Sequence, residues 1–206
     1  MFAFTVSHDG FVSRLDDAER EILARLIADV ALLVRGFPAG PEPLADAQDP
    51  IGHLDFDPEA DRVAALTDVT DPALVRLFPP MSASDPAVAE ELRFLTADEL
   101  RQQKLANLSL VAAGLAEASG SVNVRDGDEA RWLAALTDLR LVLAARLGIE
   151  DDAAAEEVHA LALAALDRPA EDRLEEQRMA FASLYTGVTW WQESLLRAVT
   201  ARRAGD

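Results

Sequence analysis

The sequence predicts a mostly α fold, a helical bundle with a small N-terminal β-hairpin. Most of the chain carries apolar residues at the spacing of about 3.6 residues per turn that is typical of amphipathic helices. Strand-like alternation of apolar and polar residues is confined to residues 2–15 and to residues 121–125. A chain of 206 residues has the length of one ordinary domain, so we expect a single domain over 1–206.

The hairpin is predicted from alternation on either side of a turn. Apolar residues alternate over 2–6, and Asp9-Gly10 is a strong signal for a hairpin turn. An isolated hairpin is only marginally stable in water, so it must pack against helices or gain another strand. Residues 121–125 also alternate and are bounded by glycines. We therefore expect this segment to pair with the hairpin and complete a three-stranded sheet.

The helices are predicted from capping signals and apolar stripes. The first begins at Asp16, where Glu19 supplies the spacing of a capping box, and ends at Gly36. Residues 36–58 are rich in proline and glycine, so we expect a mobile loop there. Asp-Pro steps open short helical turns at Asp57-Pro58, Asp71-Pro72 and Asp85-Pro86. Longer helices are expected over residues 96–118, 128–147, 152–166 and 170–201.

The charge excludes some classes of partner. The chain has 37 acidic and 19 basic residues, a formal net charge of −18. Because the basic residues are scattered, the chain repels nucleic acid and anionic membranes, and we expect neither as a partner. The acidity indicates either a solvated surface that keeps the protein soluble or a basic protein partner. No stretch is apolar for long enough to span a membrane, and no signal peptide is recognised at the N-terminus.

Cations on apolar helix faces are the candidate binding residues. Lys104, the only lysine, falls at the centre of an apolar stripe, with Asn107 at its edge. Arg140 falls inside the stripe of the next helix and requires a carboxylate partner, for which Asp138 and Glu193 are candidates. The cluster is either a structural ion pair or a snorkelling side chain, or else a small polar pocket for an anion or a partner's carboxylate. A catalytic lysine is the remaining alternative.

Trp190 is a candidate anchor for a partner. On the last helix, Trp191 lies on the apolar face, and Trp190 points about 100° away from it. Trp190 therefore lies either on a second buried face or at the surface as an anchor for a partner. Its neighbours on the helix are small residues, which would let another helix approach closely.

Three segments resemble a known family. The first runs from Leu77-Phe78-Pro79-Pro80 to Arg101, the second is 132–143, and the third is Trp190-Trp191-Gln192-Glu193-Ser194-Leu195. In this order they resemble the actinobacterial family called domain of unknown function 2017, over nearly the whole chain. The resemblance implies a small cytoplasmic, mostly helical protein and no assigned activity. Family genes often lie near that of the proteolysis adaptor ClpS. Members are sometimes labelled transcriptional regulators, but this chain shows no helix-turn-helix signal.

No motif in the sequence carries catalysis. Glu156 and His159 have the spacing of a di-iron ligand pair, but the chain has no second such pair, and no glycine-rich phosphate loop occurs. We expect no metal and no cofactor. The sequence favours a non-catalytic interaction or regulatory protein whose partner is another protein or a second copy. The family resemblance implies a link to regulated proteolysis. The alternatives are a small-molecule or anion-binding protein or enzyme that uses the Lys104/Arg140 cluster, and then a DNA-binding regulator.

Overall fold

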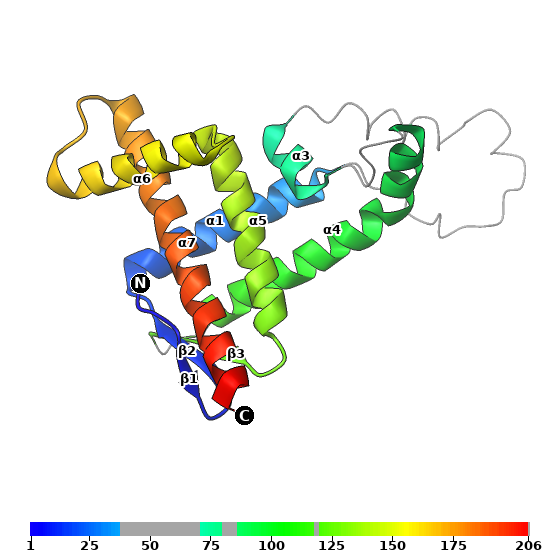
Figure 1. Cartoon of the computed structure of the whole chain (residues 1–206), viewed down its shortest axis with the longest axis horizontal. Coiled ribbons are helices and arrows are strands. Elements are labelled where there is room, and N and C mark those ends of the chain that lie inside the picture. Colours follow the sequence, from blue (N-terminus) through cyan, green and yellow to red (C-terminus); the bar gives the residue numbers. More distant parts are fainter. Residues whose placement is uncertain (38–70, 80–85, 118–119, 206) are drawn as a thin grey trace, which may run out of the picture.

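The computed structural model describes residues 1–37, 71–79, 86–117 and 120–205. These residues form six helices and one three-stranded sheet, so the prediction of a mostly α fold is confirmed (Figure 1). The sheet lies at one end of the long C-terminal helix, and a shorter helix crosses the other end. Within the segment predicted as a mobile loop, residues 38–58 lie outside the described residues.

The sheet is antiparallel, with strand order β1-β2-β3. Strands β1 (Thr5–Ser7) and β2 (Gly10–Arg14) form the predicted hairpin, and β3 (Ser121–Arg125) pairs with β2. The predicted pairing of residues 121–125 is therefore confirmed. Gly10 is required here, because its φ is 138° and a Cβ would lie 2.0 Å from the carbonyl oxygen of Val124.

The first two helices start where the sequence predicts. Helix α1 (Asp17–Arg35) is capped by Asp16, whose side chain accepts from the Glu19 amide while the Glu19 side chain accepts from the Asp16 amide. Helix α3 (Pro72–Leu77) is capped by Asp71, which accepts from the amide of Ala73. In both cases a side-chain oxygen satisfies a backbone donor that has no partner within the helix.

The start predicted at Thr96 is wrong. Helix α4 (Pro86–Ala116) runs through this position as a single helix of 31 residues. Its start at Pro86 agrees with the Asp85-Pro86 signal. No proline or glycine lies between Pro86 and Gly114, so no helix-breaking residue ends the helix that begins at Pro86 before it reaches Thr96. A capping sequence without a preceding helix breaker does not by itself begin a new helix.

The last three helices follow the prediction more closely. Helix α5 (Glu129–Leu147) ends at Gly148, which has a left-handed φ of 70°. Helix α6 (Asp152–Asp167) is capped by Asp151, which accepts from the amide of Ala154. Helix α7 (Arg173–Gly205) begins three residues later than predicted and extends to Gly205. The glycine at the end of α5 and the Asp151 cap of α6 explain why the sequence predicted these two boundaries better than those of α7.

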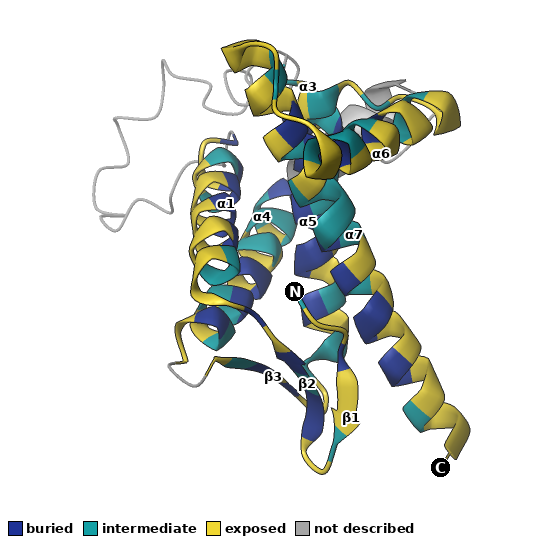
Figure 2. Ribbon diagram, turned by 90° about the vertical axis from the view of Figure 1, so that its left-hand side faces the viewer, coloured by how far each residue is buried: buried dark blue, intermediate teal, exposed yellow. Residues whose placement is uncertain are grey.

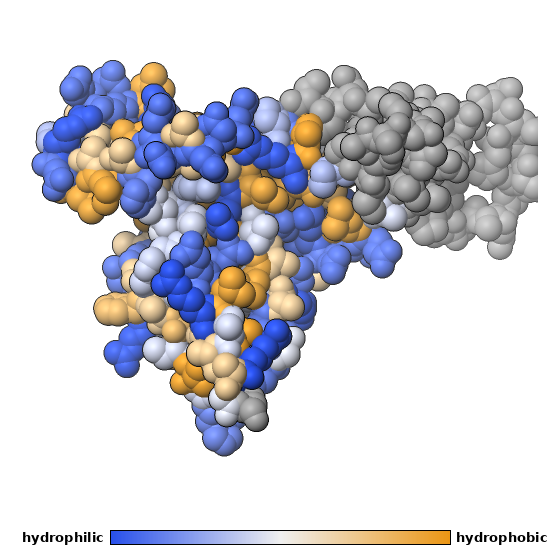
Figure 3. Space-filling view, viewed as in Figure 1, coloured by the Kyte–Doolittle hydropathy of each residue, from blue (hydrophilic) through white to orange (hydrophobic). Residues whose placement is uncertain are grey.

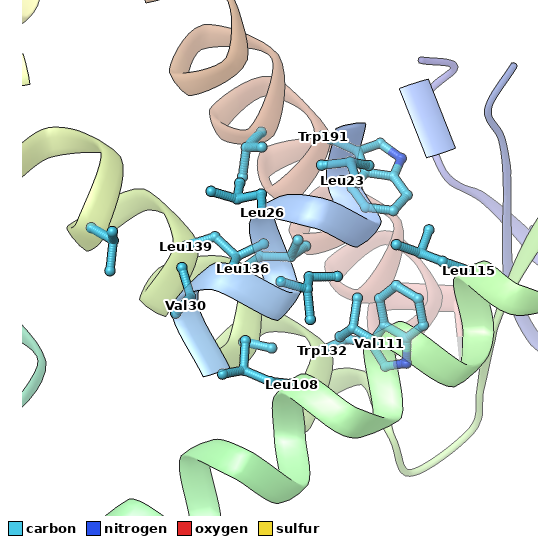
Figure 4. Close-up of a cluster of buried hydrophobic side chains, with 14 of the residues drawn as sticks. Leu23, Leu26, Val30, Leu108, Val111, Leu115, Trp132, Leu136, Leu139 and Trp191 are labelled. Carbon is cyan, nitrogen blue, oxygen red and sulfur yellow. The ribbon is translucent and has the colours of Figure 1, made fainter. Parts of the chain in front are cut away.

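The main core forms where α1, α4, α5, α7 and the sheet meet, and their buried faces turn toward one another (Figure 2). Trp132 of α5 and Trp191 of α7 lie at its centre, with ring centroids 6.2 Å apart (Figure 4). The Trp191 indole donates to the hydroxyl of Ser13 on β2 at 2.8 Å, and its ring stacks on Phe4. Trp191 therefore joins the helices to the sheet, and its burial confirms its predicted place on the apolar face of the last helix. Helix α6 packs on α7 through a separate, smaller cluster.

Candidate functional site

Lys104 and Asp138 form a buried ion pair between α4 and α5. The Lys104 ammonium donates to Asp138 Oδ1 at 2.6 Å, and the two side chains are 13% and 6% exposed. The ammonium also lies 5.9 Å from the centre of the Phe78 ring. Burial raises the pKa of Asp138, and the Lys104 charge opposes this rise. The pair is closed, because each charge faces the other and little of either side chain meets solvent.

Asn107 lies one turn beyond Lys104 on α4 and is also buried. Its side-chain oxygen accepts from Arg131 Nε at 3.3 Å. Arg131 in turn is ion-paired with Asp128, at the start of α5. The structure therefore joins Asn107 to the first turn of α5. Sequence analysis missed Arg131 as its partner, because no pattern in the sequence relates the two residues.

Arg140 joins α5 to α7 through neutral groups. Its Nε donates to Thr189 Oγ1 at 3.0 Å and its Nη1 donates to Gln192 Oε1 at 2.8 Å. The guanidinium carbon also lies 5.9 Å from the centre of the Tyr185 ring. Gln192 then donates to Thr137 Oγ1 at 2.6 Å. The result is a half-buried polar seam between two helices.

The predicted pairing of Arg140 with a carboxylate is wrong. Asp138 lies two residues away, on a different side of α5, where it meets Lys104. Glu193 follows Gln192 on α7, about 100° further around the helix, and is paired at the exposed surface with Arg197 at 3.1 Å. Neither acid turns toward Arg140, so the five predicted polar residues do not form one cluster.

Trp190 is exposed, so the alternative that places it on a second buried face is wrong. Its side chain is 43% exposed, whereas Trp191 is fully buried. A groove lies on each side of it along α7. The α6–α7 groove has a volume of about 420 Å³ and is lined by Leu163 and Leu166 of α6, Gly187 of α7 and Glu19 of α1.

The β1–α7 groove lies on the other side of Trp190. It has a volume of about 430 Å³ and is lined by Val6 of β1 and by Ser194, Arg197 and Ala198 of α7. We call Trp190 and these two grooves the Trp190 surface. Figure 3 shows hydrophobic side chains at the surface over α6 and near the end of α7 where β1 lies. The Trp190 surface is open and largely apolar, which suits burial against another macromolecule.

The open features of the described residues are apolar, and the polar ones are closed. Among them, no group of three or more His, Asp or Glu side chains could hold a metal ion. In the same part of the chain, no helix is long and apolar enough to cross a membrane. The polar residues singled out from the sequence are engaged with one another or with their neighbours, and the open features are the apolar grooves beside Trp190.

Fold and site together define a mostly helical protein with closed polar contacts between its helices and an open apolar surface along α7. The model of one protein family, described as "Domain of unknown function (DUF2017)", matches residues 1–199. The chain belongs to this family, as its resemblance indicated. Neither the curated proteins nor the solved structures gave a match.

Proposed function

We propose that this protein is a non-catalytic interaction protein that binds a partner protein through the Trp190 surface. The observation that carries the proposal is the exposure of Trp190 between two grooves. Tryptophan is among the residues that contribute most to binding energy at protein interfaces, where it fills a pocket on the partner or closes one on its own side. Leu163 and Leu166 extend the apolar area beside it, with 51% and 81% of their surface exposed.

The buried ion pair between Lys104 and Asp138 favours an interaction protein over an enzyme that uses Lys104 as a catalytic residue. A nucleophilic or basic lysine must reach its substrate, and the Lys104 ammonium is held by Asp138 beneath Phe78. A DNA-binding role has the least support, because acidic residues outnumber basic ones two to one over the chain. We expect no binding to duplex DNA at physiological salt, which fluorescence anisotropy with micromolar protein tests directly.

Anion binding is the second candidate function, and Arg140 is the observation that favours it. The guanidinium is half-buried, and its partners Thr189 and Gln192 are neutral, so no carboxylate of the described residues compensates its charge. A carboxylate or phosphate ligand would supply that compensation. Titration with inorganic phosphate tests this candidate: saturable NMR shifts at Arg140 that are lost in Arg140→Gln would support it.

We also propose a cytoplasmic location and a role in regulated proteolysis. Both rest on the family resemblance, which implies a cytoplasmic protein and a family whose genes often lie near that of the ClpS adaptor. The partner is then a protein of that system, or a second copy of this chain. Sedimentation of the purified protein separates these two cases, because only self-association makes the apparent mass depend on concentration.

The test is affinity capture from a lysate of the native organism, with the protein and its Trp190→Ala variant as baits. A partner that binds the natural chain and is lost with Trp190→Ala is the expected result. Leu196→Ala is the matched control, because Leu196 is 53% exposed on the same helix and lines neither groove. Capture that is equal with all three baits, or no capture at all, would contradict the proposal.

A further inference from the structure

We infer that α6 is a hinged arm, which opens from α7 as one unit while the main core stays folded. The opening is a property of the chain itself and does not depend on the proposed function. Three features carry the inference: the few side chains that α6 buries, the lack of polar contacts between α6 and the other elements, and the exposed connections at its two ends.

Helix α6 buries few side chains. Of its 16 residues only Val158 and Ala162 are buried, and they form the smaller cluster with Ala182 of α7. Helix α1 has 19 residues and buries five, all of them leucine, isoleucine or valine. The free energy gained by burial grows with the apolar area removed from water, and valine and alanine are small. The packing of α6 on α7 is therefore much weaker than that of α1 on the main core.

Polar contacts do not attach α6 to the rest of the fold. In the described part of the chain, no hydrogen bond or ion pair joins a side chain of α6 to another helix or strand. Arg168, which follows α6, pairs with Glu175 of α7, but this pair is partly exposed, and such pairs add little stability. By contrast, α5 is joined to α4 by a buried ion pair and to α7 by the half-buried polar seam.

Both ends of α6 continue into connections without helix or strand. Before α6, Ile149 ties the chain to α3, because its carbonyl accepts from Arg76 Nη2 at 2.6 Å. Glu150 and Asp151 lie between this point and α6, and both are exposed. After α6, residues 168–172 lead to α7 and are mostly exposed. Short exposed connections of this kind can absorb the backbone rotation of a hinge, so α6 can move while α3, α5 and α7 stay in place.

Opening of α6 changes the surface beside Trp190. Leu163 and Leu166 of α6 line the α6–α7 groove on one side, and Gly187 and Trp190 of α7 line it on the other. When α6 opens, its side of the groove leaves α7, and Ala182, which is fully buried against α6, becomes exposed. The β1–α7 groove is retained, because no residue of α6 lines it. The position of α6 therefore sets whether Trp190 has one groove beside it or two.

Hydrogen exchange of backbone amides tests the inference on the natural chain, followed by NMR over urea concentrations below the unfolding transition. A separate helix of 16 residues is only marginally stable in water, so the amides of α6 exchange when it leaves α7. We expect the amides of α6 to share one level of protection, at least about a hundredfold below that of α5. Their exchange should depend weakly on urea, because opening of α6 exposes less surface than global unfolding does.

The deciding variants are Val142→Ala and Val158→Ala, which shorten two valines of similar burial, 7% and 6% exposed. Val142 of α5 belongs to the main core and keeps its contacts when α6 opens. Val142→Ala should therefore lower the protection of α5 about tenfold and leave that of α6 unchanged. Val158 loses its contacts on opening and on global unfolding alike. Val158→Ala should therefore lower the protection of α6 and α5 by a similar factor.

Three outcomes would overturn the inference. The first is equal protection of α6 and α5 in the natural chain. The second is exchange of the α6 amides one by one, each with its own dependence on urea, because α6 would then fray and not open as a unit. The third is a Val142→Ala variant in which the protection of α6 falls as far as that of α5. The measurement on the natural chain decides the question even where a variant fails to fold.

Discussion

Replacing Lys104 with methionine removes one charge of the buried ion pair and keeps most of the side-chain volume. Asp138 is then left as a carboxylate that is 6% exposed and lacks its cation. Removing one partner of a buried pair typically costs about 3–5 kcal/mol of unfolding free energy. For a chain of this length, that loss lowers the melting temperature by roughly 6–20 °C. Arg25→Met is the control, because its pair with Glu21 is well exposed and is expected to contribute less than about 1 kcal/mol.

The loss of unfolding free energy in the Lys104→Met variant is expected to depend on pH. Burial raises the pKa of Asp138 above the ordinary value of 3.8, so the folded protein binds this proton more tightly than the unfolded chain does. The contribution of Asp138 to stability is therefore present at low pH and falls as pH rises through its folded pKa. Without Lys104 the pKa of Asp138 rises further, so Lys104→Met loses more stability at pH 7 than near pH 4.

Urea unfolding of four proteins tests whether Lys104 and Asp138 stabilise the fold as a pair. The four are the natural chain, Lys104→Met, Asp138→Leu and the double variant. The double variant replaces both charges with apolar groups and should lose much less than the sum of the two single losses. It also remains informative if one single variant fails to fold. Additive losses, or a Lys104→Met penalty that is equal at pH 4 and pH 7, would refute the coupling between the two side chains.

The remaining predictions concern single contacts, each checked by urea unfolding. Gly114→Ala should lose about 1–3 kcal/mol, because a Cβ would lie 2.6 Å from the Trp132 ring; an unchanged midpoint would contradict this close approach. Asp71→Ala should lose about 1–2 kcal/mol, because Asp71 caps α3 and accepts from Arg146. The bond from Arg146 lowers the pKa of Asp71, so this contribution is present above pH 3.8 and is lost as pH falls; a loss that is equal at pH 7 and pH 2 would count against it. Glu193→Ala should change stability by less than about 0.5 kcal/mol, because its ion pair is exposed.

The elements that the sequence predicted well are those fixed by local contacts. The cap of α1 involves two residues three apart, Asp16 and Glu19, and the hairpin turn depends on a single Asp-Gly step. Such contacts are encoded within a few residues and form in the same way in many folds. Helix α4 shows the limit of this approach, because the local signal at Thr96 is overridden by the helix that already runs through it.

The partners of the buried polar residues could not be predicted in the same way. The sequence placed Lys104 and Arg140 on apolar faces correctly, since both are at least partly buried. Which acid meets which cation depends on how far α4 and α7 rotate against α5, and no residue-level pattern sets that rotation. One signal was present: residues two apart on a helix diverge, so the face that Arg140 turns to α7 is not the face that carries Asp138.

The two adjacent tryptophans of α7 differ in their contribution to the fold: Trp191 is part of the core, and Trp190 is exposed. Trp191 contacts Trp132 and Phe4 and donates to Ser13, so helix, core and sheet all depend on it. Trp190 lies on the groove side of the same helix, where a small polar residue would be compatible with the same core. A large apolar side chain left at the surface adds little to stability and favours association. Its place between two grooves, beside Leu163 and Leu166, is what the proposed function explains by a partner that covers it, and the capture experiment with Trp190→Ala tests that explanation.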